Sequence, residues 1–328
     1  MEVVYFQRNS EFASIRKVFD NVAKNLGAEF RPRVVISRYR SLGLFRRLYN
    51  IIEAALRQGD INHVTGDVHF LTFLMSRRKT LLTVHDCILL EQTQGAKKRL
   101  AWFIWFWLPA KRVAVVTTVS DHTKRELIRH GVCPPEKIRV VHNPLPDEFV
   151  SAPAEFRSDR PVVLQIGTTP NKNLERLAEA LNGLGCRLRI VGKPLPLQRE
   201  ELKRNGIEIS TIDGCTDEQI VDEYRNADLV SFASTYEGFG LPIIEAQAIG
   251  RPVVTSRIPP MTEVAGEGAA LVDPHDPRSI REAIERIIRD PEHRQRLISA
   301  GHENVKRFRP QEVVAKYEAI YLELASKP

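Results

Sequence analysis

The feature that most constrains the fold is a repeated alternation of short apolar, β-branched runs with stretches of helical periodicity. In the C-terminal half, the runs VVLQIG (162–167), RLRIVG (187–192) and LVSFAS (229–234) are followed by KNLERLAEAL, LQREELKR and PIIEAQAIG. Strands that are apolar without polar alternation are typical of a parallel sheet whose two faces are both covered by helices. The pattern predicts a doubly wound α/β domain.

The N-terminal half carries the same alternation less regularly. Its candidate strands are VVYF (3–6), RVVIS (33–37), INHV (61–64), TLLTVH (80–85), VAVVTTVS (113–120) and IRVVH (138–142). Residues 143–161, rich in Pro, Ser and charge, are expected to form a linker. We therefore predict Rossmann-like domains over 1–150 and 151–308, and a C-terminal helix over 309–328 that crosses back to the first domain. Because ligands bind beyond the carboxyl ends of parallel strands, the site is expected in a cleft between the two domains.

The charge of the chain is unevenly divided. Residues 1–150 hold 24 Lys and Arg against 14 Asp and Glu, which gives a net charge of +10. Residues 151–328 hold 24 Lys and Arg against 27 Asp and Glu, which gives a net charge of −3. A basic half favours an anionic partner, such as a membrane surface, a nucleic acid or a phosphorylated substrate. The scattered cysteines show no metal-binding or redox spacing, and neither a signal peptide nor an apolar run of spanning length is apparent. These features indicate a cytoplasmic protein without a bound metal.

The motif STYEGFGLPIIE (234–245) lies where a strand is followed by a loop and a helix. Its glycines let the backbone approach a ligand, and the amides at the helix start suit phosphate oxygens. Its two carboxylates, Glu237 and Glu245, are suited to accept hydrogen bonds from sugar hydroxyls. The alternative is an ordinary helix start with an acidic residue before a tight turn. The candidate donor-binding residues of the motif are Glu237, Gly238, Phe239, Gly240, Leu241 and Glu245.

Residues 162–308 resemble the donor-binding domain of retaining glycosyltransferases of the GT-B fold, family GT4. The resemblance rests on IGTTPNKNLERL, RNADLVSFAS, EGFGLPIIEAQAIGRPVVTS and ALVDPHDP, in this order. The N-terminal half resembles the family more weakly, through INHVTGDVHF, TVHDC, TTVSDHTKREL and VVHNPL. The resemblance implies two Rossmann-like domains that face each other across a cleft, with a nucleotide-sugar donor and no cofactor or catalytic metal.

The resemblance also assigns roles to individual residues of the C-terminal half. It implies that Glu237 contacts the donor sugar, that Glu245 contacts the ribose, and that Lys172 of GTTPNKN binds the diphosphate. The alternative for Lys172 is a solvated lysine in a first helical turn. Many family members carry an Arg directly after the loop glycine, and Thr168 stands there in this chain. The other candidate donor contacts of this loop are Gly167, Thr168 and Asn173.

In the N-terminal half, His85 and Asp86 end a strand, and their family counterparts face the donor sugar. They are candidate catalytic residues with Glu237 and Lys172, unless they form only a strand-end turn. Four further residues are candidate acceptor contacts or, alternatively, turn and core residues: His63, Asp67, His69 and Arg8. Arg8 belongs to QRNSEFAS (7–14), which replaces the glycine-rich loop of many members; Asn9 and Ser10 are further candidates there.

The segment KKRLAWFIWFWLPAKR (97–112) is too short to span a bilayer. Tryptophan flanked by cations favours the lipid headgroup region, so membrane contact is one interpretation and a buried helix is the other. The candidate membrane residues are Trp102, Trp105, Trp107, Lys97, Lys98 and Arg99.

Together these features predict a glycosyltransferase that transfers a sugar to a glycan or lipid-linked acceptor, peripheral to the cytoplasmic membrane face, as in bacterial polysaccharide or glycolipid assembly. The alternatives are a nucleotide-sugar epimerase of the same fold and a subunit that binds the sugar nucleotide or lipid without catalysis. Nucleic-acid binding by the basic half has no recognisable motif to support it.

Overall fold

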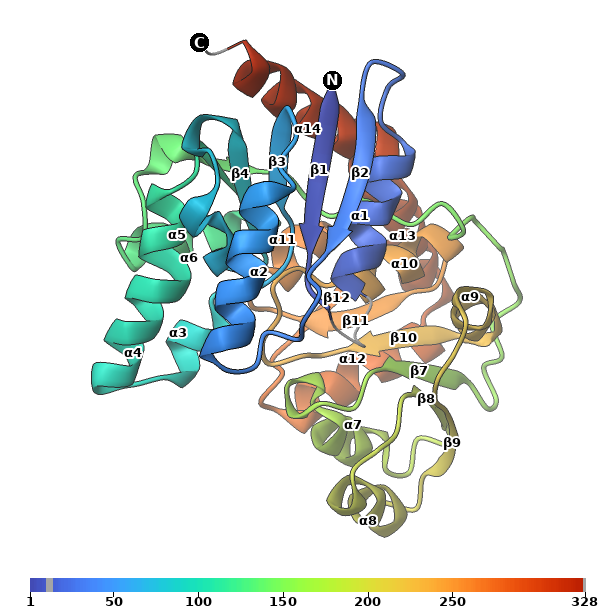
Figure 1. Cartoon of the computed structure of the whole chain (residues 1–328). Coiled ribbons are helices and arrows are strands. Elements are labelled where there is room, and N and C mark those ends of the chain that lie inside the picture. Colours follow the sequence, from blue (N-terminus) through green and yellow to red (C-terminus); the bar gives the residue numbers. More distant parts are fainter. Residues whose placement is uncertain (10–13, 327–328) are drawn as a thin grey trace. The chain divides into compact units, whose positions relative to one another are not determined.

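The computed structural model describes residues 1–9 and 14–326, so Ser10 lies outside the described residues. The chain forms two compact units. Unit 1 comprises Met1–Pro144 together with the C-terminal segment from Arg309, and unit 2 comprises Leu145–Phe308. Each unit contains one six-stranded parallel sheet covered by helices (Figure 1). The expected α/β architecture with two doubly wound domains is confirmed.

Unit 1 has the strand order β2-β1-β3-β4-β5-β6. The strands are β1 (Glu2–Gln7), β2 (Arg31–Ile36), β3 (Ile61–Val64), β4 (Thr80–Val84), β5 (Val115–Thr118) and β6 (Ile138–Val140). The helices are α1 (Ser14–Lys24), α2 (Leu44–Leu56), α3 (Ile88–Gln92), α4 (Gly95–Ala101), α5 (Leu108–Lys111), α6 (Asp121–Arg129) and α14 (Pro310–Ala325). Short 3₁₀ segments cover His69–Leu74, Arg77–Lys79 and Pro135–Lys137, and Trp102–Trp107 is π-helical.

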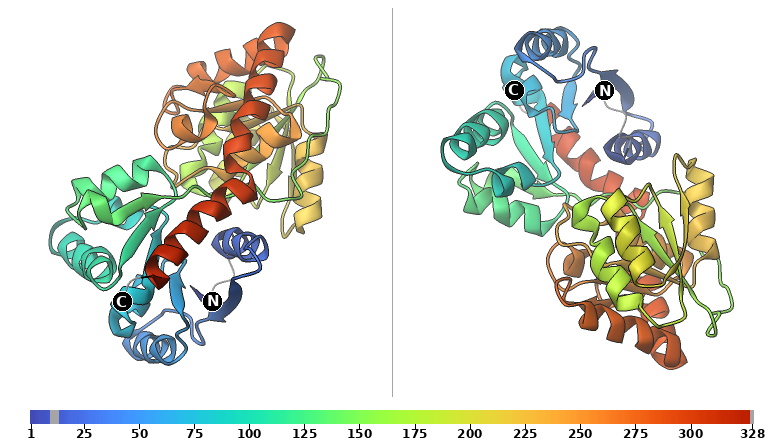
Figure 2. Two further views of the ribbon diagram at one scale, coloured as in Figure 1. Left: turned by 90° about the horizontal axis from the view of Figure 1, so that it is seen from above. Right: turned by 90° about the horizontal axis from the view of Figure 1, so that it is seen from below.

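The two faces of the unit 1 sheet are covered by different helices. On one face, Val4, Phe6 and Val35 pack with α2, α5 and α6 in a single apolar core. On the other face, Tyr5 contacts Phe19 of α1 and Tyr321 of α14. Helix α14 therefore belongs to unit 1, although its sequence follows that of unit 2, and it lies beside α1 (Figure 2).

Unit 2 has the strand order β12-β11-β10-β7-β8-β9. Its strands are β7 (Val162–Ile166), β8 (Arg187–Val191), β9 (Glu208–Ile212), β10 (Leu229–Phe232), β11 (Val253–Ser256) and β12 (Ala270–Val272). Its helices are α7 (Leu174–Leu181), α8 (Pro196–Arg204), α9 (Asp217–Asn226), α10 (Leu241–Ile249), α11 (Met261–Ala265), α12 (Pro277–Arg289) and α13 (Pro291–Asn304). Two 3₁₀ segments, Pro170–Lys172 and Val305–Phe308, complete the unit.

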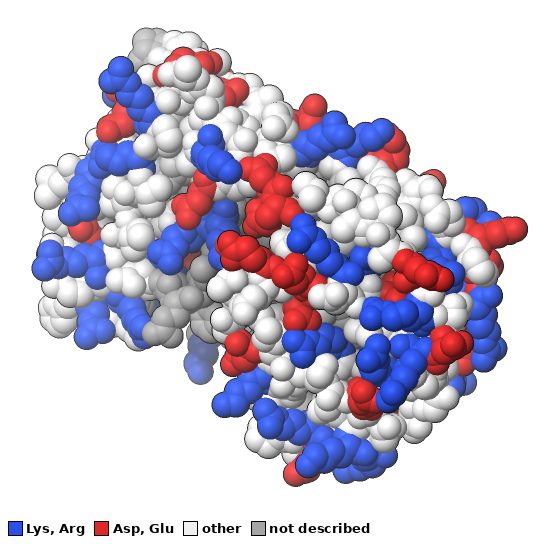
Figure 3. Space-filling model, turned by 90° about the vertical axis from the view of Figure 1, so that its right-hand side faces the viewer, with Lys and Arg blue, Asp and Glu red and all other residues white. Residues whose placement is uncertain are grey.

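Each apolar run named in the sequence forms a strand, with ends that differ from the expected ones by at most two residues. Buried strands leave a continuous apolar signal because helices cover both sheet faces. Across the described residues, no helix combines the length and the hydropathy needed to span a bilayer. Lys and Arg side chains are interspersed with Asp and Glu on the face drawn in Figure 3, so the basic excess of residues 1–150 does not form a single large patch on this face.

Candidate functional site

The candidate donor site of unit 2 lies where the chain order of its sheet reverses. Strands β7 and β10 are neighbours at the centre of the sheet, and their connections leave in opposite directions. Loops that follow two such strands diverge and leave a crevice beyond the carboxyl ends, which is the usual ligand position in this architecture. Lys172 follows β7 and Glu237 follows β10, so the sequence-predicted residues meet at this crevice.

The two charged groups of this crevice form an ion pair. Lys172 Nζ lies 2.5 Å from Glu237 Oε1, and both side chains are largely buried. The ammonium also lies 4.6 Å from the ring centre of Phe232, where a cation–π interaction holds it. Asn171 ties the two loops together, because its Nδ2 donates to the Tyr236 carbonyl at 3.0 Å and to Glu237 Oε1 at 3.3 Å. The carboxylate is thus held by two side chains of the opposite loop.

The backbone after β7 is shaped by two residues with positive φ. Gly167 has φ +84°, and a Cβ added to it would lie 3.2 Å from Lys172 Cε, so the lysine side chain packs directly over the glycine. Asn173 has φ 63°, and its Nδ2 donates to the carbonyls of Ala233 and Pro274 at 2.9 and 2.7 Å. Thr168 donates to the Lys193 carbonyl of the neighbouring loop. These contacts fix the loop that carries Lys172.

Helix α10 begins directly after the expected EGFG turn. Gly240 precedes it with φ 112°, a value that L side chains rarely adopt, and Pro242 stands in the first turn. The first-turn amides of an α-helix lack carbonyl partners within the helix, so this end suits an anion. Phe239 is buried against Phe308 and anchors the turn.

Glu245 has a partner that the sequence did not indicate. The hydroxyl of Tyr224, on α9, donates to Glu245 Oε2 at 2.5 Å. Tyr224 is fully buried, and burial, with the nearby carboxylate, raises its pKa well above the usual range, so the hydroxyl remains a donor. The Glu245 carboxylate, which is expected to contact the ribose, is therefore held in place by Tyr224.

Unit 1 contains its own pocket, of about 430 Å³, at the carboxyl ends of β1, β3 and β4. This point is again a reversal of chain order, between β1 and β3. Five of the sequence-predicted residues line it: Arg8, Asp67, His69, His85 and Asp86. The remaining wall is largely apolar and includes Ile15, Ile88, Leu89, Trp105 and Phe106.

Both histidines of the pocket donate to backbone carbonyls. His85 Nε2–H donates to the Thr65 carbonyl at 2.7 Å, and His69 Nδ1–H donates to the Trp105 carbonyl at 2.6 Å. Burial lowers the pKa of both rings, so they are neutral near pH 7 and keep the other ring nitrogen as an acceptor. A neutral imidazole, whose second nitrogen can accept a hydrogen bond, suits a sugar hydroxyl.

The charged residues of the pocket are Arg8, Asp67, Arg16 and Asp86. Arg8 Nη1 forms an ion pair with Asp67 Oδ2 at 2.5 Å, and both groups are exposed enough for salt and water to screen them. Asp86 Oδ1 accepts from the amide of Ile88 and so supports the start of α3. This contact is the strand-end turn that was the alternative for Asp86, and Asp86 also lines the pocket.

His63 is placed away from this pocket. It is fully buried in β3, with Nδ1 2.9 Å from the Tyr321 hydroxyl and Nε2 2.7 Å from Thr83 Oγ1. Burial lowers its pKa well below the usual range. The structure gives His63 a role in anchoring α14 to the sheet, and the acceptor site proposed below leaves it out.

The tryptophan segment is helical and partly buried. Trp102 Nε1 donates to the His130 carbonyl at 2.7 Å, and Trp105 packs against Phe70. Trp107 stacks on the exposed Phe103. Of the basic residues of α4, Lys97 and Arg99 are exposed and Lys98 is half-buried. Much of the indole surface thus faces the unit rather than solvent.

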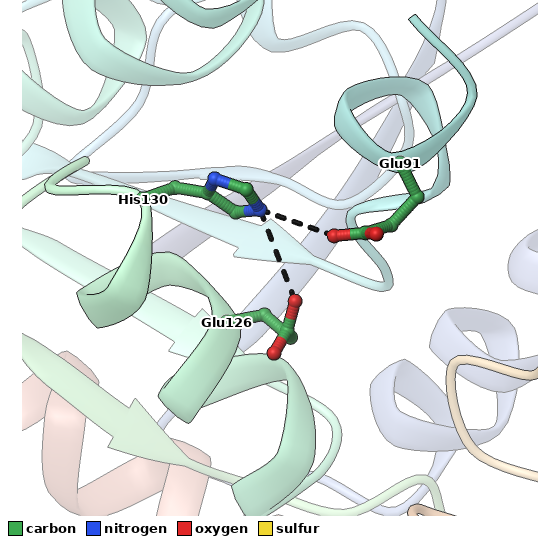
Figure 4. A group of neighbouring side chains, drawn as sticks. All are labelled: Glu91, Glu126 and His130. Carbon is green, nitrogen blue, oxygen red and sulfur yellow. Dashed lines mark hydrogen bonds and ion pairs between the residues drawn. The ribbon is translucent and has the colours of Figure 1, made fainter.

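A cluster outside both sites has the composition of a metal site. Glu91, Glu126 and His130 converge, with His130 Nε2 3.2 Å from Glu91 and 3.8 Å from Glu126 (Figure 4). Arg129 Nη2 bonds to both carboxylates, at 2.6 Å from Glu91, and the hydrogen bond with Glu126 raises the Arg129 pKa. The Arg129 guanidinium, a permanent cation, already bonds to both carboxylates and offsets one of their two charges, which disfavours a metal ion at this cluster.

Two family models match the chain in succession. "Glycosyltransferase Family 4" matches residues 4–149, and "Glycosyl transferases group 1" matches residues 146–304. The chain belongs to glycosyltransferase family 4. This confirms the resemblance seen in EGFGLPIIE and in the TVHDC segment, which carry the candidate residues of the two units.

Proteins similar in sequence include two mannosyltransferases. The chain is 30% identical over 226 residues to the MMP α-(1→4)-mannosyltransferase of Mycolicibacterium hassiacum, a match covering 65% of this chain and 54% of that protein. It is 29% identical over 219 residues to the O-antigen chain mannosyltransferase B of Escherichia coli, covering 59% and 56%. The matched part therefore spans about half the length of each relative.

The fold of family 4 members is also seen in solved structures. HepE of Anabaena, solved in complex with UDP and glucose, superimposes with a TM-score of 0.81 at 17% identity, over 98% of this chain and all of that one. At this identity the likeness establishes the GT-B fold.

Three residues lie in the sites although the sequence did not assign them there, and one of them, Trp105, was a candidate membrane contact. Asn171 is adjacent to Lys172 in the PNKN motif, so the motif itself could have indicated it. Tyr224 and Trp105 lie on helices whose pattern shows only apolar periodicity. Which buried ring faces a carboxylate or a pocket depends on packing between distant elements.

Proposed function

We propose that this family 4 member is a retaining glycosyltransferase that moves a hexosyl group from a nucleoside-diphosphate sugar to a glycan or lipid-linked acceptor. The setting we propose is polysaccharide or glycolipid assembly at the cytoplasmic membrane face. The observation that carries the proposal is the Lys172–Glu237 pair at the start of α10. The pair supports the proposal because a cation for the diphosphate and a carboxylate suited to sugar hydroxyls meet in one crevice, beside a helix start whose amides suit phosphate oxygens.

The proposed chemistry needs little from the protein beyond positioning and charge. The bond between the anomeric carbon and the diphosphate oxygen breaks, and the acceptor oxygen forms its bond to the same face of that carbon. The acceptor proton passes to the departing diphosphate. Lys172 and the amides of α10 stabilise the negative charge that develops on this leaving group.

In this scheme the resting ion pair is exchanged when the donor binds. Lys172 turns part of its hydrogen bonding from Glu237 to a phosphate, which leaves the carboxylate free to accept from sugar hydroxyls. Asn171 keeps Glu237 in place during the exchange, because it bonds to the same oxygen. The pocket of unit 1 is the proposed acceptor site, where Trp105 offers an aromatic wall and His85 and His69 offer acceptor nitrogens.

The donor is a hexose on a nucleotide, with two candidates favoured by the similar proteins. The mannosyltransferase relatives favour a mannosyl donor, and the UDP and glucose bound by HepE favour a glucosyl donor. Purified protein should be incubated with UDP-, GDP-, ADP- and dTDP-sugars, and released nucleotide measured. Slow release from one donor is expected, and product sugar should keep its anomeric configuration.

Two substitutions test the site itself. Lys172→Ala and Glu237→Gln should each lower turnover at least about 100-fold, because each removes a charge that the transition state requires. Lys203→Ala and Glu267→Gln change exposed residues of the same unit and should leave turnover unchanged. Wild-type turnover in either site variant would overturn the assignment. Release of free, rearranged sugar without any acceptor would instead favour an epimerase.

A further inference from the structure

Helix α2 of unit 1 is apolar on two faces. Asn50, Ile51 and Ala54 form the buried face, and Ile51 and Ala54 join the core beneath the sheet. The opposite side carries apolar side chains that remain exposed. These are Leu44, Phe45, Leu48, Tyr49, Ile52 and Leu56, which we call the outer face of α2.

The exposure of this outer face is large for apolar residues. Phe45 is 85% exposed, Leu56 82% and Leu44 67%. Positions 44, 48, 52 and 56 recur every four residues and therefore lie in one row along the helix. A helix of a water-soluble domain normally keeps its outward row polar, and contiguous exposed apolar patches usually mark a binding surface.

Within residues 38–58, which comprise α2 and the segments directly beside it, the charged residues are arginines apart from one glutamate. Arg40 and Arg46 are exposed at its N-terminal end, and Arg57 follows its C-terminal end. The only acid of α2, Glu53, has a side chain only 9% exposed, and it is engaged by Arg57 at 3.3 Å and by the Arg38 amide. To a partner the surface therefore presents hydrocarbon bordered by cations.

Helix α2 adjoins the tryptophan segment as well. The Arg47 guanidinium lies 4.7 Å from the ring centre of Trp105, which also lines the unit 1 pocket. Helix α2 also packs against the segment His69–Leu74, and His69 lines the proposed acceptor pocket, so the outer face of α2 and the pocket belong to neighbouring elements of unit 1.

We infer that the outer face of α2 docks on an anionic membrane surface. An interfacial helix buries apolar side chains at the headgroup boundary while nearby Arg side chains contact anionic lipids, and this face offers both groups. Charge selects the membrane over a second copy of the chain, since two such faces would bring their arginines together. The inference rests on the proposed function, because a lipid-linked acceptor would reach the pocket from this surface.

Sedimentation with vesicles tests the inference on the full chain. Vesicles of phosphatidylcholine alone are compared with vesicles of phosphatidylcholine and phosphatidylglycerol in a 7:3 ratio. The wild-type protein should bind the anionic vesicles at least about tenfold more tightly, and added salt should weaken this binding.

Two variants separate the apolar and the charged contribution. Combined Phe45→Gln, Leu48→Gln and Ile52→Gln should weaken anionic-vesicle binding at least about tenfold, because three exposed side chains lose their apolar burial. Combined Arg40→Gln and Arg46→Gln should remove the preference for anionic lipid. A matched control, with Gln at the exposed Leu195, Leu197 and Leu322, should bind like the wild type.

Donor hydrolysis needs no membrane, so it keeps the two proposals apart. The α2 variants should hydrolyse the donor at the wild-type rate, which also shows that they fold. The inference would be overturned if the variant with Phe45→Gln, Leu48→Gln and Ile52→Gln bound vesicles like the wild type. It would also be overturned if the wild-type protein did not bind anionic vesicles. A wild-type dimer that this variant converts to a monomer would overturn it in favour of self-association.

Discussion

The hydrogen bond between Tyr224 and Glu245 gives the sharpest test of the donor site. Tyr224→Phe removes one hydroxyl and keeps the ring, which packs edge-on against Phe149 at 5.3 Å. In the hydrogen bond that is lost, the Tyr224 hydroxyl donates to the Glu245 carboxylate at 2.5 Å. Bonds of this kind contribute about 1.5–3 kcal/mol. Because Glu245 is only half-buried, water can replace the hydroxyl in part, and the lower end of this range applies.

Two effects of Tyr224→Phe follow from this magnitude. The free energy of unfolding of unit 2 should fall by about 1.5 kcal/mol, which lowers its melting temperature by about 3–6 °C. If Glu245 holds the ribose, the KM for the donor should rise about tenfold, since 1.4 kcal/mol corresponds to a factor of ten. Turnover at saturating donor should change by less than about threefold, because this carboxylate does not touch the reacting bond.

A second tyrosine supplies the control. The Tyr5 hydroxyl lies 3.0 Å from that of Tyr321, fully buried in unit 1. Tyr5→Phe should cost about 1 kcal/mol of stability and leave the donor KM unchanged. A Tyr224→Phe protein with lowered melting temperature but the wild-type KM would refute the reasoning, because the hydroxyl would then serve the fold alone.

Two further predictions concern the loop after β7 and the buried histidines. Gly167→Ala should lower turnover at least about tenfold, because the added Cβ would displace Lys172. It should also lower the free energy of unfolding by about 1–2 kcal/mol, because alanine is strained at φ +84°. An unchanged turnover rate would mean that the position of the lysine is not critical. Burial lowers the folded-state pKa of His63, His69 and His85, so their contribution to stability is complete above about pH 6.5. Below that pH the unfolded chain gains protons that the folded chain does not, and the free energy of unfolding should fall by up to about 1.4 kcal/mol per pH unit for each histidine. Urea unfolding followed by tryptophan fluorescence reports unit 1 directly, since all three tryptophans lie there; a flat profile between pH 7 and 5 would contradict the burial argument.

The strands and the donor loop could be predicted because their signals are local. The apolar runs are continuous, and EGFGLP contains its own glycine and proline at the positions that the turn requires. The resemblance assigned Lys172 to the diphosphate and Glu237 to the sugar of one donor, but it did not predict that the two side chains form an ion pair. Both residues follow strands of a parallel sheet, whose carboxyl ends meet at one edge. The register that makes β7 and β10 neighbours then brings the side chains together.

Other features could not be predicted because they depend on which face of an element is covered. His63 lies in INHV, a strand buried on both sides, so its sequence does not show that the ring faces Tyr321, 258 residues away. The helix formed by LFRRLYNIIEAAL carries apolar residues on two faces. Only packing shows that Ile51 is buried and Ile52 is exposed.

The return of α14 to unit 1 has a consequence for how the protein emerges from the ribosome. Residues 1–144 are made before unit 2, but the face that holds Tyr5 and His63 is covered by α1 alone until Tyr317 and Tyr321 have been translated. Unit 2 is contiguous in sequence, so it can fold before α14 has been translated. Unit 1 is still incomplete at that stage. Helix α14 is made after unit 2, so a chain truncated before residue 309 has a first unit without this helix.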